Sequence, residues 1–167
     1  MRILAIVAIG LVAACSSEAP PADAPAETAA ALKPGEYEVS GKIETLRSTD
    51  GGTPATKSKL GDPPVLARAC VAADGTMEPM MFGEAGDECK TENAYARNGR
   101  LNLQLSCTRE GAPGQVMQTI NGSFTSEGFI AEATTGTYFT GSGDYSMKRT
   151  LAGKRVGECP PAAAAKS

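Results

Sequence analysis

The stretch CKTENAYARNGRLNLQLSC, residues 89–107, decides the fold. Its dipeptide Asn98-Gly99 is the strongest short-range signal for a β-hairpin, because both residues tolerate positive φ. After this turn, Leu101, Leu103 and Leu105 alternate with polar residues, which is typical of a strand with one buried face. The stretch therefore predicts two antiparallel strands that present one apolar face to a core.

The register of this hairpin depends on the length of its loop. A two-residue loop would pair Tyr95 with Asn102 and mix the two faces, whereas a three-residue loop would pair Tyr95 with Leu101 and keep the apolar residues together. We expect the three-residue loop, which also sets Cys89 opposite Cys107 at a separation that suits a disulfide. An ordinary surface loop, with the cysteines paired elsewhere, is the alternative.

The rest of the chain repeats the pattern of strands joined by short turns. Strand-like segments occur at residues 37–43, 65–71, 115–125, 127–139 and 144–151, with one helical turn within 76–82. These segments predict a mainly β fold: an antiparallel meander of about seven strands that forms a curved sheet, a half-barrel or a small barrel. The residues expected on its apolar inner face are Tyr37, Val39, Tyr95, Leu101, Leu103, Leu105 and Phe129.

Disulfides are expected to support the thin core of a chain that has no Trp. The four cysteines of the domain allow three connectivities. If Cys89 is bonded to Cys107, then Cys70 is bonded to Cys159, which would tie an early strand to the last one and help hold the sheet closed. Such bonds persist in an oxidising compartment.

The N-terminus predicts export and lipidation. Arg2 precedes an apolar run over residues 3–12, which is too short for the ~20 residues that span a bilayer and reads as a signal peptide. The run ends in Val12-Ala13-Ala14-Cys15, which resembles the lipobox of bacterial lipoproteins. By that resemblance Cys15 becomes the acylated first residue of a lipoprotein, with palmitate among its acyl chains, and Ser16 favours the outer membrane. A chance cysteine in an ordinary secretory signal is the alternative.

These patterns divide the chain into four parts. The signal peptide occupies residues 1–14. A tether rich in Pro and Ala follows over residues 15–33 and cannot form a core of its own. We expect the disulfide-bonded β domain over residues 34–159 and a disordered tail over residues 160–167.

Five features of the β domain, in this order, are similar to a known family. They are Pro34-Gly35-Glu36-Tyr37-Glu38-Val39, Cys70, the pair Cys89 and Cys107, Asp144-Tyr145, and Arg155-Val156-Gly157-Glu158-Cys159. This set resembles domain-of-unknown-function family 3617 over residues 34–159. The resemblance implies a secreted or lipid-anchored protein and carries over no catalytic residue and no cofactor.

The composition argues against most chemistry. The chain has no histidine, which excludes Ser-His-Asp and Cys-His catalysis and histidine zinc sites. A net charge of −3 without a basic arm argues against nucleic acid. Two hypotheses apply to the methionines Met77, Met80 and Met81. They form either an apolar plug over one end of the sheet or a Cu(I) site with thioether ligands. We expect no enzyme, no cofactor and no metal.

The function predicted on this basis is that of a lipid-anchored envelope protein, on the periplasmic side of the outer membrane. Its partners would be the membrane, through Cys15, and a small apolar ligand or another envelope component. The alternative is a structural or accessory domain that binds protein and has no ligand pocket. A cavity lined by Tyr37, Leu101, Leu103 and Phe129 would favour the first hypothesis, and an exposed apolar patch the second.

Overall fold

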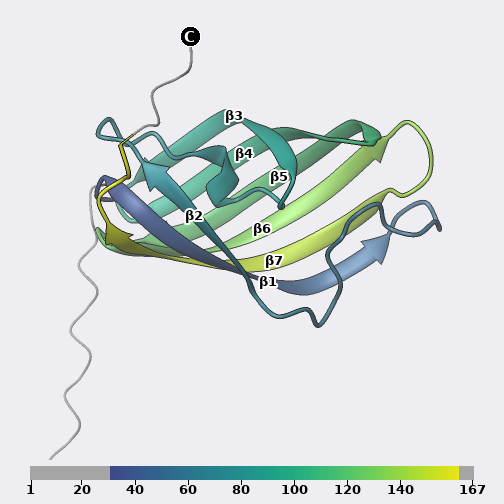
Figure 1. Ribbon diagram of the computed structural model, residues 1–167, viewed down its shortest axis with the longest axis horizontal. Helices are drawn as coiled ribbons and strands as arrows, with labels where there is room; N and C mark the ends of the chain where they lie inside the picture. Colours follow the sequence, from purple (N-terminus) through teal and green to yellow (C-terminus); the bar gives the residue numbers. More distant parts are fainter. Residues whose placement is uncertain (1–30, 162–167) are drawn as a thin grey trace, which may run out of the picture.

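The computed structural model describes residues 31–161, which form one seven-stranded antiparallel sheet curled into a half-barrel (Figure 1). This confirms the predicted mainly β fold, and the 3-10 turn η1 is the one helical element of the described residues. None of their helical segments is long and apolar enough to cross a membrane. The elements are β1 (Gly35–Ser48), β2 (Val65–Val71), η1 (Pro79–Met81), β3 (Asp87–Arg97), β4 (Arg100–Arg109), β5 (Ala112–Phe124), β6 (Gly128–Phe139) and β7 (Tyr145–Gly157).

The strand order is β2-β1-β7-β6-β5-β4-β3, so only β3 to β7 form the predicted meander. The chain begins at the other side of the sheet, where β1 pairs with β7 and with β2. The two edge strands of the described sheet are β2 and β3, and Figure 1 shows β2 and the η1 segment lying in front of the strands β3 to β6. The sheet is therefore curled but open, and the η1 segment lies on its concave side.

The hairpin closes with a two-residue loop, so the predicted three-residue loop is wrong. Asn98 and Gly99 have φ of 52° and 71°, which suits the turn type whose twist matches that of the strands. Tyr95 consequently pairs with Asn102, lies on the outer face and is 49% exposed. A β-bulge between Thr91 and Asn93 then shifts the register by one residue.

The bulge restores the predicted pairing at the base of the hairpin. Cys89 lies opposite Cys107, and the two form a disulfide with a Cα–Cα distance of 4.0 Å. The prediction was therefore right at the cysteines and wrong at Tyr95, because one bulged residue compensates for the shorter loop.

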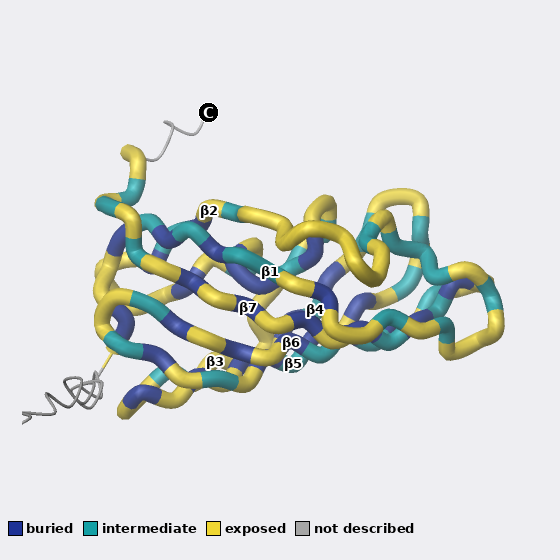
Figure 2. Tube along the Cα trace, turned by 90° about the horizontal axis from the view of Figure 1, so that it is seen from below, coloured by how far each residue is buried: buried dark blue, intermediate teal, exposed yellow. Residues whose placement is uncertain are grey.

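The core lies on the concave face, because along strands such as β4 to β7 buried residues on this face alternate with more exposed residues on the outer face (Figure 2). Tyr37, Val39 and Phe129 join the leucines of β4 in one cluster of buried residues. Leu32 belongs to the same cluster, so the packed domain begins two residues earlier than predicted, within the stretch assigned to the tether. The predicted signal peptide, Cys15, most of the tether and most of the tail lie outside the described residues.

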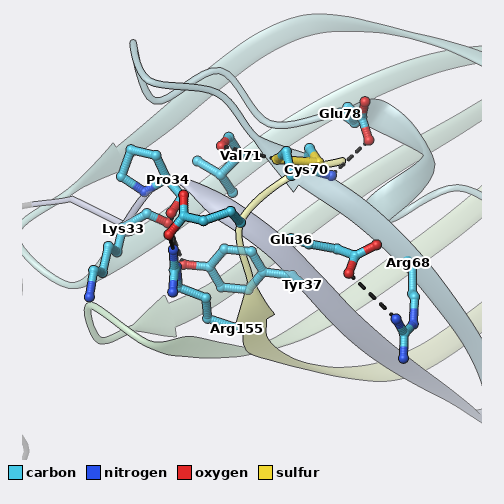
Figure 3. The surroundings of a disulfide bond; sticks show 11 residues. Lys33, Pro34, Glu36, Tyr37, Arg68, Cys70, Val71, Glu78 and Arg155 are labelled. Atoms are coloured by element: carbon cyan, nitrogen blue, oxygen red, sulfur yellow. Dashed lines mark hydrogen bonds and ion pairs between the residues drawn. A yellow bond between two sulfur atoms is a disulfide. The ribbon is translucent and has the colours of Figure 1, made fainter. Parts of the chain in front are cut away.

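The second disulfide joins Cys70 of β2 to Cys159, with a Cα–Cα distance of 5.9 Å (Figure 3). Since β1 lies between β2 and β7, this bond holds three neighbouring strands together and does not close the sheet. The expectation that it helps to hold the sheet closed is therefore wrong. Close to it, the Tyr37 hydroxyl donates to the Lys33 carbonyl oxygen at 2.8 Å. Arg155 Nε donates to the Pro34 carbonyl oxygen at 2.8 Å, so the start of the domain is tied to its end.

Gly153 of β7 provides a test of this packing. It lies directly opposite Phe129 of β6, and a Cβ atom at Gly153 would overlap the Phe129 ring. We expect Gly153→Ala to lower the free energy of unfolding by about 1–3 kcal/mol, because the ring must move. Gly136→Ala on β6 is the control, since its Cβ would meet nothing within 4 Å. Urea unfolding of the oxidised protein measures both, and equal stability of the two variants would contradict the packing.

Candidate functional site

The concave face of the half-barrel is filled by residues 77–84, which we name the plug. Met77, Met81, Phe82 and Glu84 of the plug are buried, and the Phe82 ring lies 5.4 Å from the Phe129 ring. A β-bridge from Met77 to Val71 fixes its start. The plug therefore occupies the space where an apolar ligand was expected.

The three plug methionines do not present their sulfur atoms together. Met77 and Met81 are buried in the core, while Met80 is 59% exposed. Because the three sulfur atoms do not face one common site, this arrangement favours the apolar plug over the Cu(I) site. Groups of three His, Cys, Asp or Glu side chains able to hold a metal ion are also lacking in residues 31–161.

Arg149 of β7 binds the backbone of the plug from the concave face of the sheet. This side chain points from β7 into the concave face and is only 9% exposed. Its guanidinium donates to the carbonyl oxygens of Phe82 and Gly83, at 2.5 and 3.2 Å, and to the side-chain oxygen of Gln118 at 3.2 Å. Burial lowers the pKa of Arg149, and the charge of Glu84 opposes this effect. The arginine thus fixes the backbone of the plug against β5 and β7.

Arg109 forms a second anchor at the end of the plug. Its guanidinium contacts both carboxylate oxygens of Asp87, at 2.6 and 2.8 Å, and donates to the Tyr145 hydroxyl at 2.9 Å. It also lies 3.3 Å from the Glu84 carboxylate and donates to the Ala55 carbonyl oxygen at 2.6 Å. Burial lowers the pKa of Arg109, but the bond to Asp87 and the charge of Glu84 outweigh it, and the pKa is raised overall.

Tyr145 completes this ionic cluster. Its hydroxyl donates to Glu84 Oε1 at 2.7 Å, and the Thr56 hydroxyl donates to Glu84 Oε2 at 3.0 Å. Burial raises the pKa of Tyr145 well above its usual value, and the Glu84 charge raises it further. The two guanidinium groups of Arg109 and Arg149 balance the two carboxylates of Glu84 and Asp87. We name these four residues and Tyr145 the clamp, in which both acids are bound by Arg109.

Three buried polar atoms beside the clamp lack a hydrogen-bond partner among the described residues. They are Arg149 Nε, Gln118 Nε2 and the Thr135 hydroxyl. Gln118 pairs directly with Thr135 across β5 and β6, and Arg149 is bonded to Gln118, so the three groups are neighbours. Two of them are pure donors, and the group that would satisfy them is a hydrogen-bond acceptor such as a water or a ligand oxygen.

Two open hollows lie on the outer face of the sheet, on either side of Ile130, which is 65% exposed. Ile130 is directly opposite Ala152, in the first hollow, and Ser123, in the second. The first hollow, of about 220 Å³, is lined by Glu38, Ser40, Leu66, Ala152, Gly153 and Lys154. The second, of about 530 Å³, is lined by Tyr95, Arg100, Leu101, Asn102, Asn121, Gly122 and Ser123.

Of the seven residues expected on the apolar inner face, the structure brings six together. Tyr95 alone lies on the outer face, where it lines the larger hollow. Sequence reasoning missed the clamp, although a signal was present: Arg149 follows Tyr145 and Met147 in the buried phase of β7. A charged residue in an apolar alternation predicts a buried ionic contact. The six inner residues are Tyr37, Val39, Leu101, Leu103, Leu105 and Phe129.

A comparison with protein families matches residues 32–159 to the family described as protein of unknown function, DUF3617. The chain belongs to the DUF3617 family. The match begins at Leu32, where the packed domain begins, and ends at Cys159 of the second disulfide. The comparisons with curated proteins and with solved structures found no match. This DUF3617 domain is therefore interpreted from its own geometry.

The pKa of Tyr145 makes the clamp testable. Because this pKa is raised on folding, the stabilisation is complete below the unfolded value of about 10 and is lost as the pH rises above it. We expect Tyr145→Phe to lower the free energy of unfolding at pH 7 by about 1–3 kcal/mol, since Glu84 loses a donor. The variant should also lose less stability than the unmodified protein between pH 10 and about 12.

Urea unfolding at several pH values measures this effect. Tyr138→Phe is the matched control, because Tyr138 is 68% exposed on β6. It should behave as the unmodified protein at every pH. A pH profile for Tyr145→Phe identical to that of the unmodified protein would contradict the clamp.

Proposed function

We propose that this DUF3617 protein is a non-catalytic binding domain of the cell envelope, which recognises a polar envelope component, of glycan type, on the outer face of its sheet. The observation that carries the proposal is the hollow of about 530 Å³ around Asn102 and Asn121. The concave face is the other candidate surface, and the plug and its clamp already occupy it. The outer face thus offers the more accessible recognition surface.

The lining of the larger hollow suits a ligand rich in hydroxyl groups. Asn102 donates its amide to Asn121, and each amide keeps further donor or acceptor capacity toward solvent. Arg100 adds a charged donor, and Tyr95 adds an exposed ring with a hydroxyl. Aromatic faces beside planar polar groups fix the orientation of polar ligands.

The arrangement of the acids supports a non-catalytic role. Glu84 and Asp87 are bound by Arg109, and Glu36 and Glu38 both contact Arg68 on the outer side of the sheet. A hydrolase of the two-carboxylate type needs one acid and one base across a cleft that is free for substrate. The shifted pKa values of Arg109, Tyr145 and Arg149 belong instead to the clamp that holds the plug.

A second candidate function is supported by the three unpartnered atoms under the plug. In this alternative an amphiphilic ligand displaces the plug, and its polar head accepts hydrogen bonds from Arg149 and Gln118. Its apolar chain would then replace Phe82 against Phe129. Native mass spectrometry of the oxidised protein tests this version, because a copurified ligand adds a mass that organic extraction removes.

The place of action proposed here is the periplasmic side of the outer membrane. The lipobox around Cys15 supports lipid anchoring, and the two disulfides favour an oxidising compartment. Several acyl chains would make the attachment stable, because one chain alone binds membranes marginally.

The anchor is tested by Cys15→Ser in the full chain. We expect the unmodified protein to incorporate labelled palmitate and to sediment with membranes, whereas the variant does neither, because it lacks the thiol that is acylated. Ser16→Ala serves as the control and should keep both properties. Membrane sedimentation of Cys15→Ser at the unmodified level would contradict the lipid anchor.

The recognition surface is tested by Asn121→Ala, with Gln115→Ala on the outer face of the same strand as its control. The probe is a set of soluble muropeptides titrated into the isotope-labelled protein while backbone amide shifts are followed. We expect shifts around residues 100–102 and 121–123, at least tenfold weaker binding for Asn121→Ala and no change for Gln115→Ala. Shifts confined to the plug would favour the second candidate, and a complete lack of shifts would contradict glycan binding.

A further inference from the structure

The strand β3 forms a free edge that carries charges without partners. Among the described residues it pairs with β4 alone, and Figure 1 shows it at the border of the sheet. Glu88, Lys90 and Arg97 are exposed on this strand and take part in none of the ion pairs of residues 31–161. An edge of eleven residues with open peptide groups is a template for another strand.

The bulge at Glu92 exchanges the two faces of this strand. Before it, Glu88 and Lys90 lie opposite outer-face residues of β4, and after it Tyr95 and Arg97 do so. A regular strand can meet its own copy face to face only when residues of the same parity are opposed, because side chains alternate with period two. In β3 the bulge changes this rule, and even-numbered residues before it share a face with odd-numbered residues after it.

We propose that β3 pairs antiparallel with β3 of a second copy of this chain, about a two-fold axis that passes between Glu92 and Asn93. In this register Glu88 lies opposite Arg97 of the second copy, and Lys90 lies opposite Tyr95 of the second copy. Symmetry repeats both contacts, so the outer face gains two ion pairs and two contacts between an ammonium group and an aromatic ring.

The open peptide groups fit the same axis. The residue pair that flanks a two-residue turn is hydrogen-bonded, so alternation directs the peptide groups of Ala94 and Ala96 away from β4. Beyond the bulge, the same alternation directs those of Thr91 and Cys89 to the free edge. The axis sets Thr91 opposite Ala94 of the second copy and Cys89 opposite Ala96 of the second copy. The groups that lack partners in one copy therefore meet each other.

The dimer stands independently of the proposed glycan site, although it would bring the two larger hollows together, since Tyr95 lines each of them. A membrane anchor would favour this pairing by concentrating the copies in one plane. The opposing hypothesis is that the bulge and the charges of β3 protect the edge against pairing. The two hypotheses differ in whether Glu88 and Arg97 act on each other between copies.

The experiment places a photo-crosslinking amino acid at Tyr95 in the full chain, expressed in its own envelope. Tyr138 is the matched control, because it is an exposed tyrosine on the outer face of β6, away from the edge. We expect a covalent dimer from position 95, joined to the region of Lys90 in the second copy, and none from position 138. Arg97→Glu should reduce the dimer at least tenfold, and Glu88→Arg combined with Arg97→Glu should restore it.

The charge exchange keeps the proposal open to refutation. Lys154→Glu, at an exposed position of β7 away from this edge, controls for a general effect of charge and should leave the dimer in place. The proposal is overturned by a lack of dimer from position 95, by equal yields from positions 95 and 138, or by a crosslink to a different protein alone. It is also overturned if the combined exchange does not recover what Arg97→Glu removes. Muropeptide binding is measured separately from dimer formation, so the failure of the proposed dimer can be distinguished from the failure of the proposed glycan site.

Discussion

The burial of two guanidinium groups inside the half-barrel is the constraint on which the rest of the structure depends. A sheet of seven strands that does not close leaves its concave face open to water, and the plug covers this face with its own apolar side chains. Arg149 binds the plug backbone and Arg109 binds the acids at its end. Removing one partner from such a network leaves a buried charge uncompensated, which costs far more than the net contribution of the intact network.

Because the plug and the clamp cover the concave face, the outer face of the sheet is the more accessible one. With the concave face filled, the proposed recognition surface is the outer face, where residues of β3, β4 and β5 line the larger hollow. Burial and the charges of this clamp cause the shifted pKa values: Tyr145 is hydrogen-bonded to Glu84 and to Arg109, and Arg109 forms an ion pair with Glu84. The unpartnered atoms of Arg149, Gln118 and Thr135 mark a part of the concave face whose hydrogen bonding is incomplete among the described residues.

The hairpin connects local turn chemistry to the properties of the sheet edge. A two-residue turn and a bulge at Glu92 together place Cys89 opposite Cys107 and turn Tyr95 outward. Gly83 of the plug lies close to the sulfur of Cys89, so the disulfide also supports the plug from the side of β3. One bulged residue thus affects the disulfide, the hollow around Tyr95 and the face that β3 offers to another strand.

The sequence by itself determined the mainly β fold and the inner positions of β4, because alternation and turn preference act between neighbouring residues. The expected cysteine pairs are present as well, although Cys89 lies opposite Cys107 only because a bulge compensates for the shorter loop. Lipidation at Cys15 remains a prediction from the sequence. Only the tertiary structure decided that β1 lies between β2 and β7, that Tyr95 faces outward and that Arg149 grips the plug. For the strand order and for Arg149 the physical reason is distance along the chain: Arg149 meets Phe82 across 67 residues, and such contacts depend on how the whole sheet curls. For Tyr95 the reason is the two-residue loop, which sets it opposite Asn102.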